Sequence, residues 1–241
     1  MNSGSQTNAR LTRKELGARD RKIIDTVIRL RILTNDAVEQ LFLSEANANA
    51  TIKVTGRLVK SGWLKSSDLV GRRQYFLPGI KTVRSFGLPA CRSRPLGPQA
   101  LATQLALVEY VATTKPTLRV LTENEIIALV ANATKQQRAL QHALEYGIEE
   151  GPMRLLRVDL GGSPVHVAKK LEADIRIRVG HPYYSNMLAQ RRLIVVVLTT
   201  TELKKTLVET AIAKRKWPKG VRFSVIVVSI LGSLLGGKYV D

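Results

Sequence analysis

The fold of this chain is decided by residues 46–79, which read ANANATIKVTGRLVKSGWLKSSDLVGRRQYFLPG. Residues 46–61 have the spacing of a helix with one apolar side, and Gly62 suits the left-handed position that closes a helix. The side chains expected to be buried are Ala48, Ile52, Leu58 and Val59.

The opposite side of this predicted helix is polar and basic, without an acidic residue. Its members follow one another at spacings of four, four and three, which places them on one stripe. They are Asn49, Lys53, Arg57 and Lys60, with Asn47 and Thr55 beside them. Such a stripe suits a DNA major groove, because Arg and Lys donate to guanine and Asn pairs with adenine. A solvated basic face is the alternative interpretation.

Residues 63–77 predict two short strands joined by a turn near Val70 and Gly71. A hairpin that directly follows three helices forms a wing, whose cations contact phosphates or the minor groove. The cations at or beside this turn are Lys65, Arg72 and Arg73. Pro78-Gly79 ends the hairpin, and residues 80–86 add a short helix.

Two further helices are expected before residue 46. The first covers residues 19–31, and the second follows an N-cap at Thr34 or Asn35. The second is expected to bury Ala37, Val38, Leu41 and Phe42. Residues 1–18 form a basic N-terminus that is expected to be partly disordered.

Residues 19–87 resemble the winged helix-turn-helix of the plasmid replication-relaxation family and, more loosely, winged-helix regulators in general. The resemblance rests on RDRKIIDTVIRLRILTNDAVEQLFL, GRLVKSGWLK and GRRQYFLPGIKTVRSFG. These segments keep the order of helix, turn, short helix, recognition helix, wing and Pro-Gly turn. The resemblance implies binding of double-stranded DNA.

The charge of the chain also favours an anionic partner. Lys and Arg number 38 against 19 Asp and Glu, a formal net charge of +19. This favours nucleic acid first and an anionic membrane surface second. Because 44% of the residues are hydrophobic, a packed core is expected and a disordered basic tail is excluded.

The composition predicts two domains separated by LPACRSRPLGP, residues 88–98, because three prolines interrupt helix and strand there. Residues 99–241 are expected to form a mixed α/β domain, so the chain as a whole is of mixed α+β and α/β class. Its helices are predicted at residues 98–112, 122–133, 135–146 and 202–216. Its strands are predicted at residues 153–160, 165–167, 171–179, 193–198 and 221–228, the last two parallel.

The replication-relaxation resemblance implies a second domain similar to PD-(D/E)xK nucleases. Such a nuclease needs an acid on one strand, and an acid and a lysine on the next, to hold a metal and assist water. Asp174 occupies the first position, but the second strand offers only Val195, Val196 and Val197. The domain is therefore predicted to be catalytically empty and to serve assembly or partner binding.

No cofactor, metal or small-molecule substrate is expected. Cys91 is the only cysteine, and His142, His166 and His181 lack metal-ligand spacing. The N-terminus lacks a secretory signal, and the apolar run 223–237 is too short to span a membrane. These features predict a cytoplasmic protein without a membrane segment.

The sequence thus favours a sequence-specific DNA-binding protein, expected to be a homodimer, that acts in transcription or in replication or transfer of a mobile element. One alternative is a metal-dependent nuclease or a nicking-complex accessory that depends on Asp174. Another is a non-specific nucleic-acid-binding scaffold, for which the charge alone would suffice.

Overall fold

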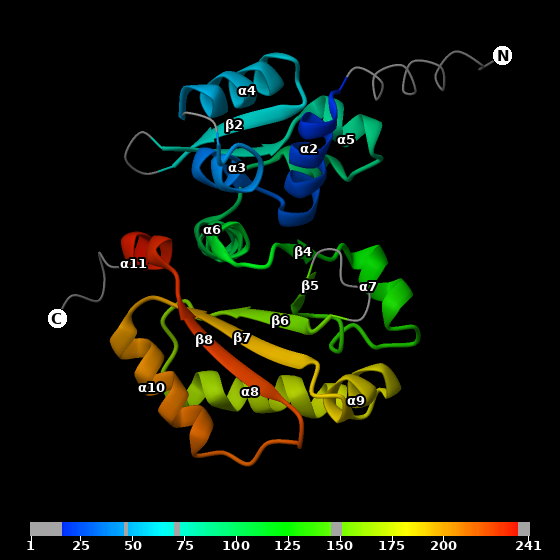
Figure 1. The fold of residues 1–241 in the computed structure, drawn as a ribbon, viewed down its shortest axis with the longest axis vertical. Helices are drawn as coiled ribbons and strands as arrows, with labels where there is room; N and C mark the ends of the chain where they lie inside the picture. Colours follow the sequence, from blue (N-terminus) through cyan, green and yellow to red (C-terminus); the bar gives the residue numbers. More distant parts are fainter. Residues whose placement is uncertain (1–15, 46–47, 70–72, 146–150, 236–241) are drawn as a thin grey trace. The chain divides into compact units, whose positions relative to one another are not determined.

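The computed structural model describes residues 16–45, 48–69, 73–145 and 151–235. Its contacts divide the chain into two compact units, residues 1–104 and 105–241. Each unit combines helices with its own β-sheet, so the class is mixed α and β as predicted (Figure 1). The division falls after the predicted linker, residues 88–98.

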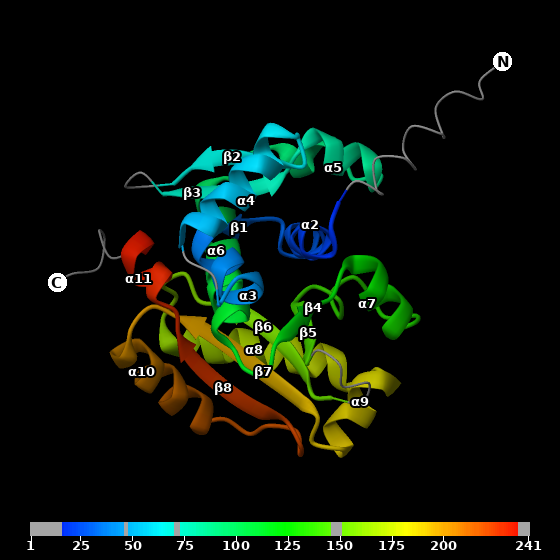
Figure 2. The same ribbon diagram turned by 45° about the horizontal axis from the view of Figure 1, so that its top comes forward.

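The first unit consists of short helices around a three-stranded antiparallel sheet of order β1-β3-β2 (Figure 2). Its helical elements are α2 (Ala18–Leu30), α3 (Asn35–Phe42), α4 (Ala48–Lys60), α5 (Ile80–Ser85) and the 3-10 turn η2 (Ala90–Ser93). Its strands are β1 (Leu33–Thr34), β2 (Leu64–Asp68) and β3 (Gln74–Pro78). The three helices and the hairpin expected from the sequence are present, whereas β1 is an addition.

Helix α3 begins at the predicted cap. Thr34 accepts a hydrogen bond from the backbone N–H of Ala37 at 3.2 Å, which satisfies one of the donors left open at a helix start. Ala37 and Val38 are buried as expected, but Leu41 and Phe42 are only half-buried.

Helix α4 is rotated relative to the sequence prediction. Ile52, expected in the core, is 58% exposed, and Val59 is half-buried. Leu58 is buried as predicted, and the buried stripe also comprises Thr51, Val54 and Thr55, while the side chain of Ala48 lies outside the description. Thr55 can be buried because its hydroxyl donates to the Thr51 carbonyl at 3.0 Å, so it is a core residue rather than a neighbour of the outer stripe.

Two glycines join the end of α4 to the end of the hairpin. Gly62 has φ +77°, the left-handed conformation predicted for it. A Cβ on Gly79 would lie 2.2 Å from the Gly62 carbonyl oxygen, so only glycine fits there. The backbone N–H groups of Gly79 and Lys81 donate to the carbonyls of Trp63 and Gly62 at 2.8 and 3.1 Å. These contacts fix the base of the hairpin against α4.

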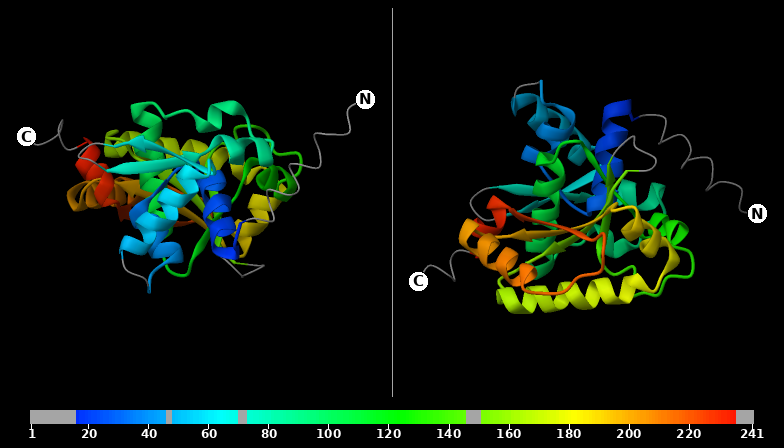
Figure 3. Two further views of the ribbon diagram at one scale, coloured as in Figure 1. Left: turned by 90° about the horizontal axis from the view of Figure 1, so that it is seen from above. Right: turned by 60° about the horizontal axis from the view of Figure 1, so that its bottom comes forward.

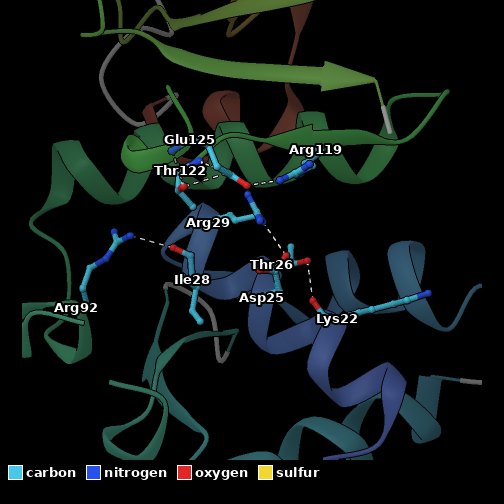
Figure 4. A network of polar contacts seen from close by, with 9 residues as sticks. All are labelled: Lys22, Asp25, Thr26, Ile28, Arg29, Arg92, Arg119, Thr122 and Glu125. Carbon is cyan, nitrogen blue, oxygen red and sulfur yellow. Dashed lines mark hydrogen bonds and ion pairs between the residues drawn. The ribbon is translucent and has the colours of Figure 1, made fainter. Parts of the chain in front are cut away.

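The segment after α5 is bonded to the rest of the first unit. Arg92 donates to the Ile28 carbonyl of α2 at 2.9 Å (Figure 4), and the Ser93 hydroxyl donates to the Pro78 carbonyl at 2.6 Å. Part of the predicted linker is therefore anchored structure.

The second unit is built on a five-stranded sheet of order β4-β5-β6-β7-β8. Its strands are β4 (Leu118–Val120), β5 (Gln141–Glu145), β6 (Met153–Val158), β7 (Leu193–Thr199) and β8 (Arg222–Val227). Strands β4, β5 and β6 are antiparallel, and β6, β7 and β8 are parallel, which confirms the predicted parallel pair. The helices are α6 (Pro98–Thr113), which begins in the first unit, α7 (Glu123–Leu129), α8 (Pro164–Val179), α9 (Pro182–Ala189), α10 (Glu202–Ala213) and α11 (Ser229–Leu235).

Two sequence predictions in this unit are wrong. Residues 165–167 and 171–179, predicted as strands, belong to helix α8, which begins at the Ser163 cap with Pro164 in its first turn. Residues 135–146, predicted as a helix, contain strand β5, which pairs with both β4 and β6. The predicted helix 122–133 is present but ends at Leu129, with the expected capping box between Thr122 and Glu125 (Figure 4).

Helices α8, α9 and α10 all cover one face of the sheet (Figure 3). The core on this face includes Leu155 and Val197 from the strands, and Leu171 and Val208 from the helices. Within the described part of the chain, no helix is both long and apolar enough to cross a membrane.

Candidate nucleic-acid interface

The outer face of α4 presents three of the predicted groove residues to solvent. Asn49, Lys53 and Lys60 are all exposed, at spacings that place them on one side of the helix. Ile52 lies next to Lys53 and gives this face one large apolar side chain. Asn47 lies outside the described residues. The exposed surface of α4 therefore offers amide, ammonium and methyl groups, which are the groups that read base edges in a major groove.

Arg57 has a partner that sequence reasoning did not identify. One terminal nitrogen of its guanidinium contacts both carboxylate oxygens of Asp20 in α2, at 2.7 and 2.9 Å. The Asp20 side chain is 9% exposed and that of Arg57 is 58% exposed. Arg57 is thus held by α2 at one nitrogen, although more than half of its side chain is exposed.

The buried side of α4 fixes its position against α3. The Thr55 hydroxyl lies 3.0 Å from the Asn35 side-chain oxygen, where α3 begins. Thr51 is fully buried beside it. Because α3 and α4 are linked by polar contacts as well as by apolar packing, the outer face of α4 has one defined orientation.

The hairpin places two of the three predicted wing cations at its surface. Lys65 of β2 and Arg73, directly before β3, are exposed. The Leu69 N–H donates to the Arg73 carbonyl at 2.7 Å, which continues the ladder beyond the paired strands. Arg72, Val70 and Gly71 lie outside the described residues. Two cations are therefore available for phosphate contacts along this hairpin.

The base of the hairpin is packed and hydrogen-bonded to its surroundings. Trp63 is buried, and the Lys81 ammonium lies 5.0 Å from the centre of its ring. The buried Thr82 hydroxyl donates to the Trp63 carbonyl at 2.5 Å. These contacts hold the hairpin in a fixed place relative to α4.

Asp174, the candidate catalytic acid of the second unit, forms an ion pair with Arg157. Asp174 lies on helix α8, not on a strand, and its carboxylate accepts hydrogen bonds from Arg157 of β6, one of them from Nε at 2.9 Å. Nothing among the described side chains brings three His, Cys, Asp or Glu together as a metal would need. Asp174 is therefore placed to join β6 to α8.

A buried polar network in the second unit was also missed from the sequence. Arg178 is fully buried, donates to the Asp174 carbonyl at 2.7 Å and lies over the ring of Tyr184. His142 is fully buried as well, with Nδ1 2.6 Å from the Leu140 carbonyl and Nε2 2.7 Å from the Tyr184 hydroxyl. A neutral ring satisfies both contacts when Nδ1 donates and Nε2 accepts.

Burial, assisted by the charge of Arg178, lowers the pKa of His142 to about 4. His181 caps α9 by accepting from the Tyr183 N–H at 3.3 Å. Both histidines, and Tyr184 with them, thus have structural partners.

No family model matches the chain, and no curated protein or solved structure matches it significantly. The resemblance to the replication-relaxation family therefore stays a prediction.

Proposed function

We propose that the first unit is a winged helix that binds double-stranded DNA sequence-specifically. In this proposal α4 is the recognition helix in the major groove, and the β2–β3 hairpin is the wing on the backbone or minor groove. The observation that carries the proposal is the exposed Asn49, Lys53 and Lys60 face on a helix whose opposite side is fixed in the core.

Duplex DNA is favoured over single strands for two reasons. The major groove admits one helix, and a stripe of amide and cationic side chains on a single helix suits that geometry. Single-strand binders instead offer exposed aromatic rings on which bases stack. In the described part of the first unit, Trp63, Tyr75 and Phe76 are buried and Phe42 is half-buried, so Phe86, at 39% exposed, is a single ring and not a row of stacking platforms.

The wing supplies affinity more than sequence discrimination. Lys65 and Arg73 can contact phosphates, which every sequence carries, whereas Asn49 and Lys53 can contact base edges, which differ. The biological role proposed for the chain is regulation of transcription, or replication or transfer of a mobile element.

Selection from a random-sequence duplex library tests the proposal. At about 150 mM salt, where non-specific phosphate binding is weakened, the protein should enrich a defined motif. Retention of all sequences alike would contradict sequence-specific binding and leave a general polyanion binder. A parallel incubation with magnesium tests the nuclease alternative, for which cleaved strands that disappear in Asp174→Ala would be the expected result.

A further inference from the structure

Strand β8 is an open edge of the sheet in the second unit. It pairs with β7 on one side, and no strand of the described residues pairs with it on the other (Figure 1). Its side chains are less covered than those of β7: only Val225 is fully buried, whereas six of the seven β7 residues are.

One hydrogen bond shows which backbone N–H and C=O groups of β8 point away from β7. The N–H of Val228 donates to the Thr199 carbonyl of β7 at 2.9 Å. Because backbone groups alternate between the two sides of a strand, those of Phe223, Val225 and Val227 point away from β7. None of the described residues bonds to these backbone groups, so the three residues form a row of open donors and acceptors.

Beyond the exposed Arg222 at its first position, this edge lacks the features that usually block strand pairing. Lysine, proline, a bulge or inward charge commonly protects an edge strand. From Phe223 to Gly237 the sequence contains no charged residue and no proline. The opposite edge, β4, is only three residues long and carries the exposed Arg119, which pairs with Glu125.

We propose that β8 pairs antiparallel with β8 of a second copy of this chain, which joins the two sheets across a two-fold axis. The outward residues of both strands must face each other, so the axis passes through Val225 and Phe223 faces Val227 of the other copy. This register places the two Arg222 side chains at opposite ends, where they do not repel. It also sets the buried Val225 beside its own copy, so that the core continues across the axis.

The second copy is favoured over a different protein because the edge is complementary to itself. After Arg222 the strand carries no charge for a different partner to match, and β-branched pairs such as Val225 with Val225 stabilise antiparallel sheets. A dimer built this way would carry two first units, as the reading of two half-sites requires.

The experiment measures the mass of the full-length protein in solution, without DNA, by size-exclusion chromatography with light scattering. The wild type should have twice the 26.7 kDa mass of one chain at micromolar concentration. Val227→Pro should be monomeric, because proline removes an outward N–H while leaving the β7 ladder intact. Val227→Ala, which keeps that N–H, is the matched control and should stay dimeric.

Circular dichroism shows whether Val227→Pro is folded. If proline also disrupts the fold, Ser224→Lys adds a cation at the half-buried edge without changing the backbone, and it should likewise be monomeric. A monomeric wild type, or a folded Val227→Pro or Ser224→Lys variant that stays dimeric, would overturn the proposal. The readout contains no DNA, so failure here leaves the proposed DNA binding untouched, and failure of DNA selection leaves this interface untouched.

Discussion

At the scale of single residues, the ion pair between Arg57 and Asp20 changes what the outer face of α4 can do. A carboxylate that is almost buried needs a cation, and Arg57 supplies the closest one from the outer face of α4. Arg57 therefore positions α4 against α2, while its side chain stays 58% exposed. In the proposed complex, Asn49 and Lys53 are the exposed residues assigned to read bases.

A double-mutant cycle tests this role of Arg57. Arg57→Ala leaves Asp20 with only the longer, 3.8 Å contact to Arg19, so it should lower the free energy of unfolding by about 1–2 kcal/mol. The double variant Arg57→Ala with Asp20→Ala should lose less unfolding free energy than the sum of the two single variants. The difference, which is the coupling energy of the pair, should be about 1 kcal/mol because solvent screens the exposed Arg57. Urea unfolding measures both. Lys53→Ala, one turn earlier in α4, is the control, and its unfolding free energy should change by less than about 0.5 kcal/mol. If the effects of Arg57→Ala and Asp20→Ala on unfolding free energy were strictly additive, the assigned ion pair would be contradicted.

His142 predicts a specific pH dependence. Its pKa is lowered to about 4 in the folded protein, so the unfolded chain takes up a proton first as the pH falls below 6.5. Stability should therefore be lost between about pH 6.5 and pH 4. His142→Gln lacks this titration, so the difference in unfolding free energy between wild type and variant should change by up to about 3 kcal/mol over that range.

Comparing the two proteins cancels the titration of the carboxylates they share. The measurement is urea unfolding at pH 7, 6, 5 and 4. A difference that stays constant over these values would show that His142 is not held neutral.

At the scale of elements, the first unit could be predicted from sequence because its signals are local. The apolar spacing of residues 19–31, the Thr34 cap, the closing Gly62 and the alternation of the hairpin each indicate one structure. The elements that could not be predicted depend on distant partners. Strand β5 forms because two neighbouring strands pair with it, which outweighs local helical spacing.

Helix α8 shows a second cause of failure. Its start signal, Ser163-Pro164, is present in the sequence, but a run of branched residues suggested strands. Asp174 was consequently placed on the wrong element. The partners of Arg57 and His142 lie 37 and 42 residues away along the chain, so local patterns could not indicate them.

The junction between α4 and the hairpin gives a prediction at this scale. Gly79→Ala should lower the free energy of unfolding by about 2 kcal/mol or more, because its Cβ would collide with the Gly62 carbonyl. Gly17→Ala is the matched control, since Gly17 also precedes a helix with extended backbone but has open space around its Cβ position. That change should be within about 0.5 kcal/mol of neutral. Equal effects of the two substitutions on urea unfolding would refute this view of the junction.

At the scale of the whole molecule, the net charge and the arrangement of side chains on α4 have separate parts in the proposed function. A net charge of +19 draws the protein to any polyanion and weakens that attraction as salt rises. It cannot select a sequence, which requires a fixed set of donors and acceptors such as the α4 face. A dimer paired through β8 would then carry a second DNA-binding unit, which recognition of a DNA site with two halves requires.

The most direct test of the central claim compares two double variants on the selected duplex and on a scrambled duplex of equal length, by fluorescence anisotropy. Asn49→Ala with Lys53→Ala should weaken binding to the selected duplex by about 1–3 kcal/mol or more and change scrambled binding far less. Lys65→Ala with Arg73→Ala should weaken binding to both duplexes about equally. If the wing variant lost discrimination and the α4 variant kept it, α4 would not be the element that reads DNA sequence.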